Sequence, residues 1–135
     1  MTSSQNVDRV RAIYAEWERG NMSAGPEVFD PELVFEAFLP EATERVTVKG
    51  LLEVEMFMRE FLRQWRDYRL FGDEFRAIGS DAVVVLGHQT ASGRQSGATV
   101  EHPMSSAWRF RDDKVVHLVF DPDPRKVFAV AGVAE

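Results

Sequence analysis

The sequence predicts an α+β fold, in which helices gather on one side of an antiparallel β-sheet. Two stretches, residues 10–17 and 54–65, carry apolar residues at the spacing of an α-helix. From Tyr68 onward the apolar period shortens to that of β-strands, and turn-forming residues separate the runs. We find no internal repeat and no long linker, so we expect residues 1–135 to form a single domain.

The first predicted helix has one apolar stripe, and its members are Val10, Ile13, Tyr14 and Trp17. The helix therefore turns aromatic side chains toward the core, and Gly20 is expected to end it. A segment punctuated by glycine and proline follows. The short apolar run Leu33–Phe38 comes next, and its composition is typical of a strand.

A second apolar stripe follows Gly50 and consists of Val54, Phe57, Met58, Phe61, Leu62 and Trp65. This spacing predicts a helix with one wide buried face. Four strands are then predicted in succession, which implies an antiparallel meander. They are Tyr68–Ile78, Ala82–Ala91, Thr99–Arg111 and Val115–Phe120. Near the end of the chain, Asp123 is predicted to cap a short helix whose first residue is Pro124.

The composition excludes several kinds of site and partner. The chain has 135 residues, no cysteine and a formal net charge of -6 at pH 7. Without cysteine there can be no disulfide framework, thiolate zinc site or cysteine nucleophile. An acidic protein repels phosphate backbones, so we expect no nucleic-acid partner. No apolar run approaches the roughly 20 residues that span a bilayer, and the start is polar, so we expect a cytoplasmic protein without membrane contact.

The predicted strand Thr99–Arg111 indicates which side chains face inward. One of its two alternating sets is mainly apolar and consists of Val100, His102, Met104, Ser106, Trp108 and Phe110. This set is predicted to face the core. His102 and Ser106 are costly on such a face unless they form hydrogen bonds or border a cavity. Both are therefore candidate pocket residues.

The preceding strand places His88 on the same face as Val84 and Leu86, but its alternation does not decide which face is inward. If the hairpin loop is centred on Gln95, His88 lies opposite His102. The two histidines would then be close enough for acid–base chemistry. Alternatively, both are hydrogen-bonded core or rim groups. They lack the characteristic spacing of metal ligands, so we expect no metal site.

Glu36 is the one charged residue of the predicted strand Leu33–Phe38. If Val34 and Phe38 face inward, Glu36 is a carboxylate inside an apolar cavity and is suited to proton transfer. If they face outward, Glu36 is an ordinary surface residue.

The order of these elements and the end of the meander resemble a known superfamily. The end of the meander reads Trp108-Arg109-Phe110-Arg111-Asp112-Asp113-Lys114-Val115-Val116, then Phe120-Asp121 and Gly132. Over nearly its whole length the chain resembles the SnoaL-like polyketide cyclases and the nuclear transport factor 2-like superfamily. The resemblance implies a curved antiparallel sheet wrapped around the N-terminal helices to form a conical pocket. It also implies a homodimer that pairs through the outer face of the sheet.

The same resemblance implies roles for individual residues. In the ketosteroid isomerase branch the base position falls on Glu36, Ser106 stands at the position of the second acid, and Tyr14 is on the first helix. The paired pocket histidines of the scytalone dehydratase branch are similar in kind to His88 and His102. No cofactor is implied by either branch.

The alignment with this superfamily also divides the last strand between its two faces. Val116, Leu118 and Phe120 take the inner face, and Val115, His117 and Val119 are left outside. The outer apolar stripe suggests a homodimer interface, in which His117 has a structural role.

Two classes of function follow. The first is a cofactor-independent isomerase, dehydratase or cyclase that acts on a small apolar carbonyl or hydroxyl compound, with Glu36, His88 and His102 as catalytic groups. The second is a non-catalytic module that binds a small apolar ligand or mediates dimerisation. The predicted pocket residues are Tyr14, Trp17, Phe38, Met104, Ser106 and Trp108. Titratable groups that converge on an open cavity would favour the enzyme, an open cavity without them the binder, and a filled cavity the interaction module.

Overall fold

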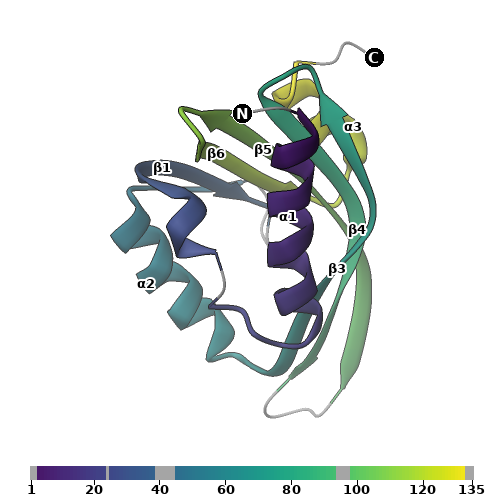
Figure 1. Cartoon of the computed structure of the whole chain (residues 1–135). Helices are drawn as coiled ribbons and strands as arrows, with labels where there is room; N and C mark the ends of the chain where they lie inside the picture. Colours follow the sequence, from purple (N-terminus) through teal and green to yellow (C-terminus); the bar gives the residue numbers. More distant parts are fainter. Residues whose placement is uncertain (1–2, 24, 39–44, 94–97, 133–135) are drawn as a thin grey trace.

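A computed structural model describes residues 3–23, 25–38, 45–93 and 98–132 of the chain (Figure 1). The helices are α1 (Ser3–Glu18), the 3-10 helix η1 (Pro26–Val28), α2 (Leu51–Leu62) and α3 (Pro124–Val130). The strands are β1 (Phe29–Ala37), β2 (Val46–Lys49), β3 (Trp65–Ile78), β4 (Ala82–Gly93), β5 (Thr99–Arg111) and β6 (Lys114–Asp121). The predicted α+β fold is confirmed.

The six strands form one sheet in the order β2-β1-β6-β5-β4-β3. Strands β3 to β6 make the predicted antiparallel meander. Strand β1 pairs in parallel with β6, so the sheet is mixed rather than wholly antiparallel. The short strand β2, which the sequence did not reveal, pairs with β1 at the edge of the sheet. Figure 1 shows the sheet curving around α1, with α2 beside β1.

The two faces of the sheet have separate cores. The inner face carries Leu33, Val83 and Trp108 and packs against α1 and α2 in one large cluster. The outer face carries a smaller cluster beneath α3, in which Val84 and Val119 belong with Val127 of the helix. The sheet is therefore buried on both faces where α3 covers it, and buried strands of this kind do not show a clear alternation.

The predicted apolar stripe of α1 is confirmed, because Val10, Ile13, Tyr14 and Trp17 are all at least nine-tenths buried. Helix α2 begins after Gly50, whose φ of 92° is readily adopted by glycine and whose backbone N–H donates to the carbonyl of Leu33. That hydrogen bond ties the start of α2 to β1. The helix therefore lies beside β1, and the cavity described below is lined by this helix, by β1 and by Trp17 of α1.

A β-bulge bends the sheet where β3 and β4 meet. Gly72 pairs with Gly87 and Glu74 with Leu86, so Asp73 is the extra residue. A Cβ atom on Gly87 would lie 1.9 Å from the carbonyl oxygen of Phe71, and only glycine fits there. Bulges increase the local bend and twist of a strand, and this one contributes to the curvature of the sheet.

The predicted outer stripe of β6 is wrong for Val115, whereas His117 and Val119 do lie on the outer face. Phe110 pairs with Val115 and Arg109 with His117, so the register shifts and Val116 is an extra residue. The shift turns Val115 into the inner core, where it is fully buried. Val119 does lie on the outer face, but α3 covers it. The two valines therefore do not form an exposed dimer interface.

Helix α3 begins as predicted. The side chain of Asp123 accepts a hydrogen bond from the backbone N–H of Arg125 at 3.0 Å, and Pro124 occupies the first turn. Hydrogen bonds from Arg125 hold the pKa of the Asp123 carboxyl below its usual value. Among the helices that the structure describes, none combines the length and the apolar character needed to cross a membrane.

Candidate functional site

A cavity of about 280 Å³ lies on the inner face of the sheet, between α1, β1 and α2. Its walls come from both helices, from the segment between α1 and β1, and from β3 and β6. The lining residues are Trp17, Met22, Ser23, Pro26, Phe29, Leu33, Phe35, Leu51, Val54, Glu55, Met58, Arg59, Leu62, Leu70, Leu118 and Phe120. Thirteen of these sixteen side chains are apolar or aromatic, so the cavity is suited to an apolar molecule.

The polar groups of the lining are few. The Ser23 hydroxyl donates to Oδ1 of Asn21 at 2.8 Å, so its proton is already used. Glu55 and Arg59 are exposed residues one turn apart on α2. Charged side chains that remain in water keep their hydration and can rim an apolar pocket without being buried. Neither one is a buried acid or base.

Aromatic rings form the wall of the cavity on the side of α1. The ring of Trp17 lies 5.0 Å from that of Tyr14, 5.7 Å from that of Trp108 and 6.1 Å from that of Phe120, between centroids. Phe29 stacks on Trp108 at 6.0 Å. Rings packed at these separations hold one another in place, so the wall is formed before any ligand arrives.

Behind this wall, three buried polar groups satisfy one another. The Trp108 Nε1–H donates to Oγ of Ser106 at 2.8 Å. The hydroxyls of Ser106 and Tyr14 share a second hydrogen bond, also 2.8 Å long. Burial raises the pKa of the Tyr14 hydroxyl above its ordinary value, so this side chain stays protonated at neutral pH. Because none of the three lines the cavity, they form a structural network that fixes α1 on β5.

One buried polar atom of Trp17 has no such partner. Trp17 is only 6% exposed, and its Nε1–H makes no hydrogen bond within the described part of the chain. The same is true of Nε1 of Trp65, which does not line the cavity. An unpaired buried N–H costs about 1–3 kcal/mol. Both indole nitrogens have almost no accessible surface, so neither donor is open to the cavity.

The predicted pocket residues divide into three groups. Trp17 lines the cavity. Tyr14, Met104, Ser106 and Trp108 are buried on the inner face but lie outside the lining. Phe38 was expected in the pocket, but Nζ of Lys126 on α3 lies 5.5 Å from its ring. The prediction for Phe38 is wrong, because the inward residues of β1 are Leu33, Phe35 and Ala37.

The predicted histidine pair does not form. Gln89 pairs with His102, and His88 pairs with Pro103, so the hairpin register differs by one residue from the expected one. A slip of one residue puts the two histidines on opposite faces of the sheet. His88 stacks on Phe71 at 4.7 Å, and its Nδ1 lies 2.9 Å from Oδ2 of Asp73.

His102 is exposed, and neither histidine lines the cavity. Gln95, the expected centre of the hairpin loop, falls outside the described residues. The strand pairs on both sides of the loop fix the register.

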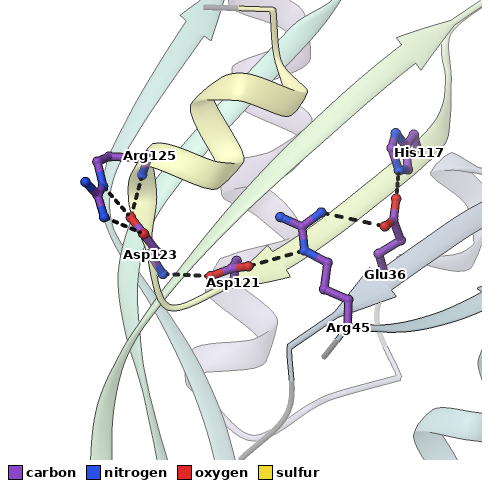
Figure 2. A network of polar contacts seen from close by, with 6 residues as sticks. All are labelled: Glu36, Arg45, His117, Asp121, Asp123 and Arg125. Atoms are coloured by element: carbon purple, nitrogen blue, oxygen red, sulfur yellow. Dashed lines mark hydrogen bonds and ion pairs between the residues drawn. The ribbon is translucent and has the colours of Figure 1, made fainter. Parts of the chain in front are cut away.

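Glu36 also points away from the cavity, as in the second of its two predicted placements, but it is partly buried among charged partners rather than an ordinary surface residue. Figure 2 shows Glu36 between His117 and Arg45. Its Oε2 lies 2.6 Å from Nε2 of His117, and Nη1 of Arg45 lies 3.6 Å from its Oε1. Arg45 also donates through Nε to Asp121, at 3.3 Å. Asp121 in turn accepts a hydrogen bond from the backbone N–H of Asp123. This chain of contacts ties β1, β6 and the start of α3 together on the outer face.

Sequence reasoning missed most of the cavity lining. Val54, Met58 and Leu62 of α2 were recognised only as members of a buried stripe. Their spacing was the available signal, because residues at i, i+4 and i+8 share one face of a helix. Part of the apolar face of α2 lines the cavity, and the rest packs against other side chains. Among the described residues, no group of three or more His, Cys, Asp or Glu side chains is placed to hold a metal ion.

Comparison with known proteins yields a family and a fold. The model of the SnoaL-like domain matches residues 10–118. No curated protein matches the chain. An NTF2-like protein of unknown function from Burkholderia pseudomallei is 21% identical, with a TM-score of 0.75 over 98% of this chain and 100% of that one.

Two further solved structures are similar. A putative SnoaL-like polyketide cyclase from Jannaschia sp. is 18% identical, with a TM-score of 0.73 over 97% of this chain and 94% of that one. TerC, co-crystallised with polyporic acid, is 19% identical, with a TM-score of 0.73 over 95% of this chain and 98% of that one. At these identities the likeness shows a shared fold.

Proposed function

Because the chain belongs to the SnoaL-like domain family, we propose that it is a small-molecule-binding protein whose ligand occupies the cavity between α1, β1 and α2. The ligand is compact and largely apolar. This is the class of function that the sequence analysis assigned to an open cavity without converging acid–base groups.

The observation that carries the proposal is the cavity itself. Its volume of about 280 Å³ is close to the lower end of the range for ligand pockets, about 300–1,000 Å³, which favours a molecule of one or two rings. Each Å² of apolar ligand surface removed from water contributes about 25 cal/mol. The packed aromatic wall adds affinity, because little side-chain freedom is lost when the ligand binds.

Acid–base catalysis has less support. Glu36 and His88 lie on the opposite face of the sheet, and His102 is exposed away from the lining. The only ionisable side chains of the lining, among the described residues, are Glu55 and Arg59 at its exposed rim. A general acid or base must come within hydrogen-bond reach of the reacting atom. The names of the similar structures, one a putative cyclase and one crystallised with polyporic acid, support a ligand pocket in this fold.

We retain two further proposals from the sequence. A homodimer is supported by the family resemblance alone, since the stripe that suggested it is covered. Sedimentation equilibrium tests it, and a monomer at high concentration would count against it. The other is a cytoplasmic location, with which the lack of cysteine is compatible because the chain needs no oxidising compartment to form disulfides.

The experiment compares two substitutions on α2. Tetralin, a bicyclic hydrocarbon, is titrated into the protein and binding is followed by NMR. Met58 lines the cavity, so Met58→Trp fills part of it and should abolish binding. Met56 is 56% exposed on the other side of α2, so Met56→Trp is the matched control and should bind as the parent does. Unchanged binding in Met58→Trp, or no binding by the parent protein, contradicts the proposal.

A further inference from the structure

A second hollow adjoins the apolar cavity. It has a volume of about 380 Å³ and is lined by the segment that follows α1, by the end of α2 and by the start of β3. Met22, Ser23 and Leu62 line both spaces. Because Ser23 is exposed, the cavity opens to solvent beside it, where the second hollow begins. A molecule too long for the cavity can therefore extend into this hollow, which we call the polar groove.

The polar groups of the groove are mostly engaged with one another. The Ser23 hydroxyl donates to Asn21, and the side-chain amide of Asn21 donates to Glu16 at 3.0 Å. The carboxylate of Asp67 is paired with Nε of Arg69 at 3.1 Å. These contacts leave little free capacity for a ligand and offset the negative charge of Asp67.

Arg66 is the exception. Its side chain is exposed and lines the groove, and it has no ion pair or hydrogen bond with any residue of the described part of the chain. The guanidinium is always charged at neutral pH, and its planar fork can bind a carboxylate through two hydrogen bonds. The groove therefore holds one available positive charge in a chain whose formal net charge is -6.

The start of β3 places Arg66 on the side of the cavity. Side chains alternate between the two faces of a strand, so Arg66 shares a face with Tyr68 and Leu70. Leu70 lines the cavity, and Tyr68 lines the groove. Arg66 is also the extra residue of a β-bulge, at the irregularity between Trp65 and Asp67. Bulges often lie beside functional sites, where they redirect a side chain.

We propose that the ligand has two parts, an apolar ring system in the cavity and a flexible chain that ends in a carboxylate paired with Arg66. The chain crosses the boundary formed by Met22 and Leu62, which both spaces share. This inference rests on the proposed function, because the ring system occupies the same cavity. Arg59 is a weaker anchor, since Glu55 lies one turn away on α2 and offsets its charge.

The test uses tetralin that carries a chain on its aromatic ring. Acetic, butanoic and hexanoic acid chains give three reaches, and each acid is compared with its own primary amide, which has the same shape and no charge. Binding is followed by NMR. In Arg66→Gln, the ratio of acid to amide affinity should fall by about 2- to 5-fold at the chain length that reaches Arg66. Dividing by the affinity of the amide cancels any general change in the cavity.

Arg63→Gln is the matched control. It removes the same charge from the same region, but Arg63 is paired with Glu60 at 2.9 Å and lines neither the cavity nor the groove. This variant should keep the parent's ratio. Equal falls in Arg63→Gln and Arg66→Gln would show an effect of net charge alone, and the inference would be wrong. A fall in Arg59→Gln without one in Arg66→Gln would place the carboxylate at the rim on α2 and would also overturn it.

Salt gives a second measurement. The Debye length is about 3 Å at 1 M salt, so the difference in ratio between the parent and Arg66→Gln should shrink there. A difference that salt does not change would contradict an ion pair in the open groove. If tetralin binds the parent but no acid shows a ratio that depends on Arg66, the inference fails and the apolar cavity stands. If tetralin itself does not bind, the proposed function fails.

Discussion

The hydroxyl of Tyr14 lies 2.8 Å from Oγ of Ser106, and this hydrogen bond joins the middle of α1 to β5. The two residues are 92 positions apart, and both are at least 99% buried. Ser106 also accepts from Trp108, so the two contacts polarise one another in a region without water. The network fixes the aromatic wall of the cavity from behind.

Tyr14→Phe should lower the free energy of unfolding by about 1 kcal/mol, because it removes one buried hydrogen bond and leaves the packing unchanged. Ser106→Ala should cost more, about 1–3 kcal/mol, since it leaves both Tyr14 and Trp108 unpaired. Urea unfolding measures both. If the double variant is as unstable as the sum of the single variants, the two side chains are not coupled and the network is wrong.

Alkaline pH should destabilise the fold. Burial raises the pKa of Tyr14 and of Tyr68 above the ordinary value of 10.0. Above that value the unfolded chain releases tyrosine protons and the folded chain keeps them. The two tyrosines therefore make their full contribution to the free energy of unfolding below pH 10. This free energy falls as the pH rises further, by up to about 1.4 kcal/mol per pH unit for each tyrosine.

Urea unfolding at a series of pH values between neutrality and the alkaline range measures this slope. Tyr14→Phe is the control, because it removes one of the two groups. Its stability should fall less steeply with pH than that of the parent. Identical slopes would show that Tyr14 does not contribute.

Substitutions on the outer face should leave ligand binding unchanged. Glu36→Gln removes the charge that faces His117 and Arg45, and should lower the free energy of unfolding by about 1 kcal/mol. His88→Ala removes a ring that stacks on Phe71. Both variants should bind tetralin within about twofold of the parent. A loss of about tenfold or more in either folded variant would mean that the outer face contributes to the site.

Most helices and strands, and the inward face of β5, could be predicted from the sequence. The stripe of α1 and the alternation of β5 are strong periodic signals, and the inward placement of Tyr14 and Trp108 is confirmed. A period of two shows which residues share a face of a strand, but it does not show how that strand is aligned with its neighbour. The hairpin register of β4 and β5 therefore differed by a single residue, and His88 moved to the outer face.

Two other features depended on contacts between distant segments. Both alternating sets of β1 contain apolar residues, so its inward face follows only from its parallel pairing with β6. The bulge at Val116 reverses the expected placement of Val115, and no local sequence pattern indicates this bulge. The cavity itself is a property of the space between α1, β1 and α2, and the periodicity of α2 does not distinguish a packed face from one that borders a void.

Intermolecular NOEs between tetralin and methyl groups of the protein locate the bound ligand. A ligand in the cavity should give NOEs to the methyls of Val54 and Leu118, which line it. It should give none to those of Val84 and Val119, which are buried beneath α3 on the outer face. NOEs to Val84 and Val119 without the first pair, or binding without NOEs to Val54 and Leu118, would show that the ligand does not occupy the cavity.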